Sequence, residues 1–171
     1  MRRPRRIVVE MPSLDREQEF LAAVRRSRAL HRRWAAPPRT SPQYRDFLNR
    51  MRGPAHYAHF VCTADGSLAG VININDIGDG RRRSARLGYY AFEPHAGRGY
   101  MRAGLLRVLQ VAFRTYGLHR LEVDIQPDNN RSIALVESLG FERRGRSALC
   151  VRLGGCWRDH ERWALTSDAC R

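Results

Sequence analysis

The stretch from Leu87 to Arg107, LGYYAFEPHAGRGYMRAGLLR, most constrains what this chain can fold into. It begins with aromatic and aliphatic residues typical of a strand, and Pro94 ends that strand because proline cannot donate to a sheet ladder. Gly97 and Gly99 follow, and a helical pattern then runs from Tyr100 to Tyr116. The spacing therefore predicts a strand, a glycine turn and the start of a helix in direct succession.

This succession is typical of an anion-binding site. Glycines let backbone N–H groups approach a ligand closely, and a helix N-terminus adds partial positive charge. Arg98 and Arg102 add guanidinium groups beside it. The alternative interpretation is a plain tight turn that leads into a helix. A Walker loop is excluded because the chain has no lysine, and Arg102 stands where a dinucleotide fingerprint needs its third glycine. We therefore expect a pyrophosphate site along Gly97–Arg102.

The composition fits a single globular domain. The chain has 171 residues, of which 43% are hydrophobic, and this suffices for one domain with its own core. No apolar run approaches the ~20 residues of a membrane span. The apolar segment Ile7–Val9 is too short for the core of a signal peptide. We expect a cytoplasmic protein that does not associate with membranes.

The net charge is +14, and every Lys-or-Arg position is an arginine. A genomic preference for arginine and an attraction to polyanions would both produce this composition. The arginines are spread along the chain, and no interleaved aromatic residues indicate a base-stacking platform. We take composition as the main cause and expect nucleic acid to bind only through non-specific charge.

The cysteines are not spaced as metal ligands. They are Cys62, Cys150, Cys156 and Cys170. We expect reduced thiols with a structural or incidental role, and no bound metal.

The other segments alternate as in an α/β domain, without repeats or linkers. The expected elements are a strand at Arg6–Met11, a helix from Ser13 to about Trp34, a helix at Ser41–Arg50, strands at His56–Thr63, Leu68–Ile77 and Arg86–Glu93, the helix after the glycine turn, a strand at Leu121–Ile125, a helix at Arg131–Leu139, and strands at Glu142–Leu153 and Asp159–Thr166. Turns at Ala64–Ser67, Gly78–Arg83 and Gly154-Gly155 connect neighbouring strands. The strands before the glycine turn should form an antiparallel meander.

The glycine turn, in this order of elements, resembles the signature of the GNAT superfamily of acyl-CoA N-acyltransferases, Arg/Gln-x-x-Gly-x-Gly/Ala. Gly99 matches the essential glycine, and Gly97 and Arg98 match residues common beside it. Ala96 and Met101 depart from the two ends of the pattern. The resemblance implies one domain over residues 1–171, of the α/β (α+β) class, with a mixed, mostly antiparallel sheet of about seven strands flanked by helices.

Further blocks extend the resemblance over essentially the whole chain. Pro127–Ile133, followed by Leu139-Gly140-Phe141, is similar to the family's Asn-x-x-Ser … Leu-Gly-Phe. Gly155–His160 is similar to the Gly-x-Trp-x-Asp-His ending of the ribosomal-protein-alanine N-acetyltransferase branch, and Ser27–Trp34 with Pro37-Pro38 resembles bacterial members of that branch. The resemblance implies transfer of an acetyl group from acetyl-CoA to an amine, without a metal.

The resemblance also implies a layout for the site. Acetyl-CoA would lie in a wedge between the strands that end at Phe92 and Ile125, with its carbonyl oxygen on a backbone N–H near Phe92. Asn129 would bind the pantetheine arm and Ser132 would meet the leaving thiolate, although the same residues also fit a helix cap and an ordinary first-turn serine. The implied cofactor-binding residues are Phe92, Gly97, Arg98, Gly99, Tyr100, Met101, Arg102, Asn129 and Ser132.

The general base stays open. Many relatives have a glutamate two residues before the Gly-Tyr pair of the strand, where this chain has Arg86. The remaining candidates are Asp124, Asp159, His160 and Glu93.

No cysteine lies beside the glycine turn with an adjacent base, so we expect no acetyl-cysteine intermediate. The amine would instead attack bound acetyl-CoA directly, in a ternary complex.

Three classes of function remain. A free α-amine has a pKa of about 8 and is partly neutral already, whereas lysine, at about 10.4, needs a stronger base. This favours a protein N-terminus, such as that of a ribosomal protein, as the acceptor. The alternatives are a small amine (a polyamine or an amine antibiotic) and a non-enzymatic nucleic-acid binder. A chain with only 17 acidic residues is poorly suited to polyamines. The oligomeric state stays open.

Overall fold

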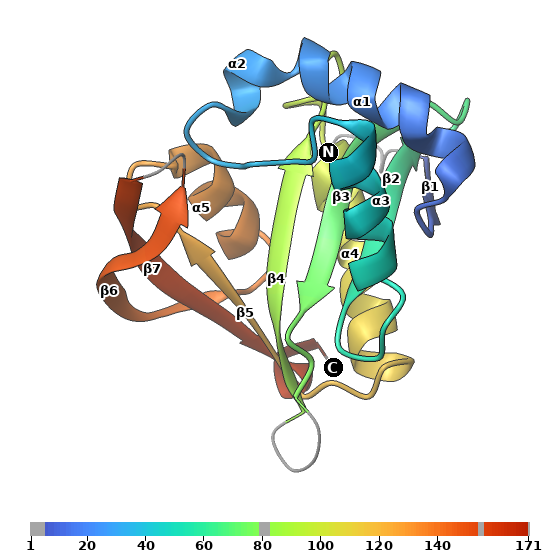
Figure 1. Cartoon of the computed structure of the whole chain (residues 1–171). Coiled ribbons are helices and arrows are strands. Elements are labelled where there is room, and N and C mark those ends of the chain that lie inside the picture. The colour runs from blue at the N-terminus through green and yellow to red at the C-terminus, as the bar shows by residue number, and fades with distance from the viewer. Residues whose placement is uncertain (1–5, 79–82, 154–155, 171) are drawn as a thin grey trace.

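A computed structural model describes residues 6–78, 83–153 and 156–170 of the chain (Figure 1). Its elements are β1 (Ile7–Glu10), a 3-10 turn (Leu14–Arg16), α1 (Glu17–Arg26), α2 (Arg28–His31), α3 (Ser41–Arg50), β2 (Tyr57–Thr63), β3 (Leu68–Asn75), β4 (Ser84–Ala91), α4 (Tyr100–Arg114), β5 (Arg120–Ile125), α5 (Asn130–Glu137), β6 (Glu142–Leu153), β7 (Cys156–Thr166) and a final 3-10 turn (Ser167–Cys170). The expected turn at Gly154-Gly155 and most of the Gly78–Arg83 turn lie outside the described residues.

The strands form one seven-stranded sheet in the order β1-β2-β3-β4-β5-β7-β6. All neighbouring pairs are antiparallel except β4 and β5, which run parallel. This confirms the predicted meander from β2 to β4 and the mixed, mostly antiparallel sheet. The parallel pair arises because α4 follows β4 and carries the chain back to the edge of the sheet where β4 begins, so that β5 starts there and runs in the same direction.

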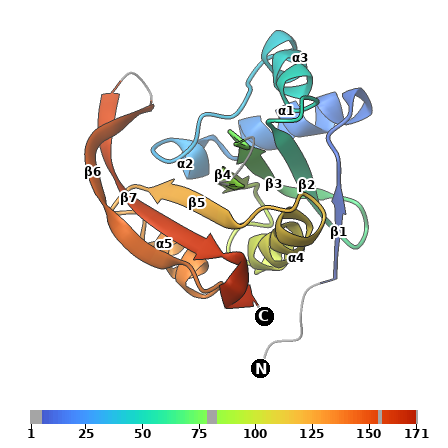
Figure 2. The same cartoon turned by 90° about the horizontal axis from the view of Figure 1, so that it is seen from below.

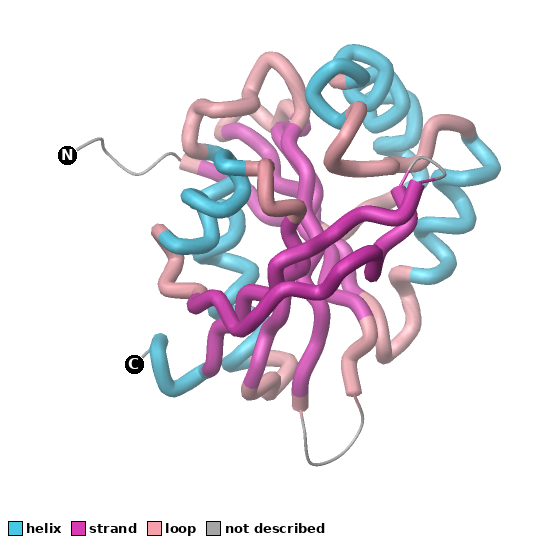
Figure 3. Tube along the Cα trace, turned by 90° about the vertical axis from the view of Figure 1, so that its left-hand side faces the viewer, coloured by secondary structure: helices cyan, strands magenta, loops and turns pink. Residues whose placement is uncertain are grey.

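Helices cover both faces of the sheet (Figures 2 and 3). The first three helices, α1 to α3, lie on one face, and α4 and α5 lie on the other. A separate apolar cluster fills each interface. On the side of α1 and α3 the largest buried side chains are Phe20, Tyr44, Phe47, Phe60 and Phe92. On the side of α4 and α5 they include Ile72, Leu105, Leu109, Leu121, Phe141 and Trp163.

Helix α4 is the element that fixes the glycine turn against the sheet. Its polar residues Arg107, Gln110 and Arg114 face solvent, as their spacing predicts. Gly104 lies on the buried side, where an added Cβ would come within 2.5 Å of a methyl group of Val61 on β2. The missing side chain therefore lets α4 approach the sheet closely, which sets the position of its N-terminus.

The expected single helix from Ser13 to about Trp34 is wrong. The segment is a 3-10 turn followed by α1 and α2, with a break at Ser27. Ser13 makes no side-chain cap, and the Ser27 hydroxyl instead accepts a hydrogen bond of 2.9 Å from the backbone N–H of Glu93. The break is thus tied to the end of β4, a contact between residues too far apart in sequence for a local pattern to reveal.

Candidate active site

Strands β4 and β5 separate as they approach their C-terminal ends, which leaves a V-shaped gap in the sheet (Figure 1). Their parallel pairing ends at Arg86↔Glu122, whereas β4 stays paired with β3 as far as Gly70↔Ala91. On its other side β5 stays paired with β7 through Ile125↔Glu161. The backbone of β4 beyond Arg86 therefore has no strand partner on the side of the gap among the described residues, and its polar groups are available to an extended ligand.

The glycine turn lies directly beyond this gap. Gly97 and Gly99 have φ angles of 71° and 87°, in the left-handed region that favours glycine. Gly99 is the N-cap of α4 and has no side chain to cap it, so the first-turn N–H groups from Tyr100 to Arg102 are left without a side-chain cap. An uncapped N-terminus of a helix of this length suits an anion such as a pyrophosphate.

The predicted cationic residues of the turn differ in their surroundings. Arg102 donates from its guanidinium to the hydroxyl and the carbonyl of Ser138, at 3.3 and 3.4 Å, and so links α4 to the end of α5. Arg98 is exposed at the turn itself. The ring of Tyr100 packs edge-on against His95, with ring centroids 5.5 Å apart. Arg102 thus holds the two helices that border the gap, while Arg98 stands where a ligand would approach.

The backbone N–H of Phe92 itself is committed elsewhere, so a carbonyl donor near Phe92, as expected, would have to come from a neighbouring residue. The side chain of Phe92 is fully buried, its N–H donates to the carbonyl of Ala69 on β3 at 2.8 Å, and its carbonyl accepts from His95. Consecutive residues of a strand direct their N–H and C=O groups to opposite neighbours. Ala91 therefore directs its backbone groups toward the gap, and it is the better candidate for the N–H that would polarise a thioester.

His31 is a site residue that the sequence analysis missed. Its Nε2 lies 2.7 Å from the carbonyl oxygen of Ala91, at the mouth of the gap. A carbonyl only accepts, so Nε2 donates and Nδ1 holds the lone pair of the neutral ring. Burial lowers the pKa of His31, partly offset by the bond to Ala91, which favours this neutral form.

A sequence signal for His31 did exist. The residue continues the buried stripe Phe20–Val24–Ser27 at helical spacing, although arginines surround it in the chain. The apolar residues Leu21 and Leu30 of this segment are only partly buried. The Nδ1 atom of His31, like the hydroxyl of the neighbouring Tyr90, is buried without a hydrogen-bond partner in the described part of the chain.

Ser132 and Tyr89 meet across the gap. Tyr89 lies on β4 and Ser132 on the first turn of α5, and their hydroxyl oxygens are 2.6 Å apart. Burial raises the pKa of Tyr89 to about 12, so its hydroxyl stays protonated at neutral pH. These two hydroxyl groups can supply a proton to a ligand atom placed in the gap between β4 and β5.

Asn129 has a structural role that the structure shows directly. It is the N-cap of α5, and its side-chain oxygen accepts a hydrogen bond of 3.2 Å from the N–H of Ser132. Within the described residues its amide NH₂ makes no hydrogen bond to the protein, so it can still donate to a ligand. The cap is therefore shown, and the free NH₂ group leaves the expected cofactor contact possible for the same side chain.

Asn129→Asp and Asn129→Ala separate these two roles. The aspartate keeps an oxygen for the cap but loses the NH₂ donor, whereas alanine loses both. If the NH₂ group binds the pantetheine arm, both variants should raise KM for acetyl-CoA by about 5- to 20-fold, the value of one ordinary hydrogen bond. Only the alanine variant should lose stability, by about 1 kcal/mol. Steady-state kinetics and thermal melts measure the two effects; an unchanged KM for acetyl-CoA in the aspartate variant would leave the cap as the sole role.

The candidate bases lie in different surroundings. Asp124 is paired with Arg86 and with Arg162 (3.2 Å), and Asp159 with Arg146 (2.8 Å). Two arginines on one carboxylate indicate a structural role for Asp124 in the contact of β5 with its neighbouring strands. Glu93 is partly buried just after β4, where Arg26 donates to its backbone carbonyl at 2.7 Å.

His160 is better placed to accept a proton. It is buried on β7, next to the end of β5, and its Nδ1 lies 3.0 Å from the carbonyl of Arg158. That carbonyl requires Nδ1 to donate, so Nε2 holds the lone pair in the neutral ring.

The thiols do not suggest a nucleophile. Cys62 is buried, and burial raises its pKa to about 11, which disfavours the thiolate. Cys156 is exposed at the start of β7. The side chains of Cys150 and Cys170 lie outside the described residues. Within those ranges we find no cluster of three or more His, Cys, Asp or Glu side chains that could hold a metal, and no helix is long and apolar enough to cross a membrane.

Comparisons with known proteins give relatives of one kind. A family model described as "Acetyltransferase (GNAT) domain" matches residues 6–142. A probable N-acetyltransferase, YjcK of Bacillus subtilis, is 30% identical over 70% of this chain and 67% of its own. The [ribosomal protein uS5]-alanine N-acetyltransferase of Escherichia coli is 31% identical over 68% of this chain, which spans 60% of that enzyme's length.

Solved structures share the fold at lower identity. RimJ of Mycobacterium smegmatis, solved in complex with CoA-disulfide, superposes with a TM-score of 0.87 at 21% identity, covering 95% of this chain and 82% of that one. A spermidine N-acetyltransferase from Vibrio cholerae, solved with CoA and spermine, gives a TM-score of 0.82 at 18% identity over 95% and 96% of the two chains. The same fold therefore serves acetyltransferases with different acceptors.

Proposed function

Because the chain belongs to the GNAT acetyltransferase family, we propose that it transfers the acetyl group of acetyl-CoA to an amine, and that this amine is a protein N-terminus of the ribosomal-protein-alanine type. The observation that carries the proposal is the V-shaped gap between β4 and β5, with the uncapped N-terminus of α4 beyond it. The gap offers strand-like backbone bonds to the pantetheine arm, and the helix offers N–H groups to the pyrophosphate.

In the proposed complex, residues of this chain bind the cofactor, polarise the thioester and protonate the leaving group. The backbone N–H of Ala91 polarises the thioester carbonyl, and His31 holds the peptide unit that follows by its bond to the Ala91 carbonyl. Asn129 donates to the pantetheine arm. The hydroxyl of Ser132, backed by Tyr89, gives a proton to the departing thiolate. The amine attacks from the side of α1 to α3, since α4 and α5 border the cofactor.

We assign the general base to His160, because Asp124 and Asp159 are ion-paired and Nε2 of His160 holds the lone pair of the neutral ring. Changing His160 to Gln should lower kcat/KM for a peptide acceptor about tenfold or more at pH 7. The loss should shrink at pH 9, because an α-amine with a pKa of about 8 is then mostly neutral without help. Asp159→Asn serves as the control and should stay within about threefold. Equal losses at both pH values, in a variant with an unchanged melting temperature, would contradict the assignment.

Direct transfer in a ternary complex is the proposed route, because no thiol is placed to receive the acetyl group. An enzyme with all four cysteines replaced by alanine or serine should keep kcat within about tenfold, that is within about 1.4 kcal/mol of barrier. Recovery of an acetylated cysteine from enzyme mixed with acetyl-CoA alone, with transfer of that acetyl to an added amine, would contradict the direct route.

The acceptor distinguishes the proposal from the small-amine alternative. The comparisons include both uS5-alanine and spermidine acetyltransferases. The proposal is tested by CoA release from acetyl-CoA with peptides that begin with Ala or Ser, with spermidine and with an aminoglycoside. Peptides should be accepted with the highest kcat/KM. Efficient turnover of spermidine or the aminoglycoside, with none of any peptide, would favour the alternative.

A further inference from the structure

We infer that the acceptor carries negative charge close to its reactive amine, as an N-terminal peptide does when aspartate or glutamate occupies its second to fourth positions. The inference rests on the proposed function and names the substrate class of the same site. Arginines surround the mouth of the gap, and three of them, Arg39, Arg50 and Arg158, have no acidic partner within the described residues.

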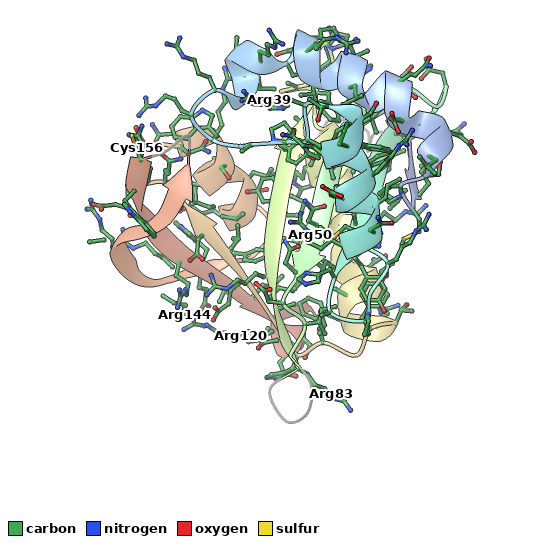
Figure 4. All side chains as sticks on the ribbon, in the orientation of Figure 1. Arg39, Arg50, Arg83, Arg120, Arg144 and Cys156 are labelled. Carbon is green, nitrogen blue, oxygen red and sulfur yellow. The ribbon has the colours of Figure 1, made fainter. Side chains whose placement is uncertain are left out.

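On the β4 side, these arginines are Arg39 and Arg50. Figure 4 shows Arg39 on the segment that crosses in front of the upper end of β4, and Arg50 on α3 in front of the middle of the sheet. The charge of Arg39 acts on His31, and the charge of Arg50 acts on Tyr90 of β4. Neither guanidinium has an ion-pair partner among the described residues.

The β5 side offers a pocket of about 240 Å³ beyond the end of the strand. Its lining residues are Arg33, Gln126, Pro127, Asp128, Arg146, Arg158 and Asp159. Two of its arginines are neutralised, since Arg33 pairs with Asp128 and Arg146 with Asp159. Arg158 has no acidic partner within the ranges that the structure describes, so the pocket keeps a positive charge.

The floor between these two sides is also basic. Asp124 pairs with Arg86 and Arg162. Arg162 also lies 3.7 Å from Glu122, which pairs with Arg120, so three guanidinium groups share two carboxylates. Glu93 is the opposing carboxylate at this end of β4, and Arg26 lies against its backbone. Unpartnered polar atoms, Nδ1 of His31 and the hydroxyl of Tyr90, are buried in the same region. The mouth thus combines uncompensated positive charge with polar atoms that lack partners.

This charge has two consequences for catalysis. A positive potential disfavours an ammonium ion, so it lowers the pKa of a bound amine and increases its neutral, nucleophilic fraction. It also repels a polyamine, which would have to bring two or more positive charges past the arginines. Carboxylates at the second to fourth residues of a peptide would be attracted by the arginines and would orient the peptide. They would also raise its association rate, by an amount that falls as the salt concentration rises.

Three peptides that differ only in charge test the inference: Ala-Asp-Glu-Phe-Gly, Ala-Gln-Gln-Phe-Gly and Ala-Arg-Arg-Phe-Gly, all amidated at the C-terminus. With the full chain at low ionic strength, kcat/KM for the acidic peptide should exceed that for the basic one by about tenfold or more, and the ratio should fall at 0.5 M salt. Glucosamine 6-phosphate, an anionic amine that is not a peptide, should be a poorer acceptor than the acidic peptide.

Charge-neutralising variants assign the preference to the mouth. Changing Arg39, Arg50 and Arg158 together to glutamine should reduce the acidic-to-basic ratio to about threefold or less. Arg144→Gln is the matched control, because Arg144 lies on β6 away from the mouth and pairs with Glu142 (Figure 4). It should leave the ratio unchanged. Equal use of the three peptides overturns the inference and leaves the proposed activity standing. A glucosamine 6-phosphate rate above that of the acidic peptide instead overturns the peptide acceptor of the proposed function. Acetyl-CoA binding without turnover of any amine overturns the proposed function as well.

Discussion

Gly99→Val is expected to weaken the binding of CoA by about 30- to 150-fold, the loss of two or three hydrogen bonds to a charged group after allowance for their non-additivity. Gly99 has a φ of 87° at the N-cap of α4. A β-branched residue is a strong outlier in that region, and its methyl groups would stand in front of the N–H groups that face the pyrophosphate. Isothermal calorimetry with CoA measures the effect.

Backbone strain alone would also destabilise the protein, so the variant needs a control that has the same strain elsewhere. Gly66 provides it: its φ is 89°, it lies in the turn between β2 and β3, and an added Cβ would have no heavy atom within 4 Å. Gly66→Val should lose a similar amount of stability, about 1–2 kcal/mol, and keep its CoA affinity. Unchanged CoA affinity in a folded Gly99→Val protein would show that the glycine turn is not the pyrophosphate site.

Ser132→Ala is expected to lower kcat about 30- to 300-fold with little change in KM for acetyl-CoA, because general acid catalysis contributes about 10²- to 10⁴-fold and the thiolate is a fairly good leaving group. Ser132 donates the capping bond to the Asn129 side-chain oxygen from its backbone N–H, so the variant keeps its helix start. Tyr89→Phe, which removes only the partner hydroxyl 2.6 Å away, should lower kcat less, by about 3- to 10-fold.

The pair of variants distinguishes a relay from a single acid. A double variant should be no slower than Ser132→Ala alone if Tyr89 acts only through Ser132. A small effect at Ser132 with a large one at Tyr89 would contradict the order of the relay and move the proton donor to the tyrosine. Single-turnover measurements isolate the chemical step from product release.

Local patterns sufficed for elements whose limits are set by their own residues. Helix α3 spans Ser41–Arg50 and strand β6 spans Glu142–Leu153 as predicted, and α4 begins at Tyr100. Pro42 lies in the first turn of α3, Gly99 directly precedes α4, and Gly140 lies shortly before β6. The family resemblance then predicted the mixed seven-stranded sheet, which the pairing confirms.

Contacts between distant segments limited the rest. The break at Ser27 depends on Glu93, and the position of His31 depends on the carbonyl of Ala91. Helical spacing within residues 13–34 indicates that His31 is buried, but it reveals neither the break at Ser27 nor the carbonyl that His31 contacts. Similarly, the start of β7 at Cys156 follows from its pairing with Leu153 near the end of the hairpin, where the sequence shows two glycines and no alternation.

The candidate site likewise contains residues that local patterns predict and contacts that only the fold creates. The glycine turn and the Asn129–Ser132 block were found because glycine and capping residues have local physical requirements. Asp124 was a reasonable candidate base on β5, but the arginines that neutralise it come from β4 and β7. The contact of Tyr89 with Ser132 likewise joins two segments that only the fold brings together.

The central claim, acetylation of a protein N-terminal amine, is tested most directly by locating the acetyl group on a peptide that offers both kinds of amine. A peptide that begins with Ala-Asp-Glu and contains one internal lysine is incubated with the protein and acetyl-CoA to partial conversion, and the products are sequenced by tandem mass spectrometry. Because the α-amine is far more often neutral than the lysine amine at pH 7.5, as their pKa values of about 8 and 10.4 require, we expect acetyl on the N-terminal alanine in at least tenfold excess. Acetyl found mainly on the lysine side chain, under conditions in which the peptide is turned over, would contradict the claim.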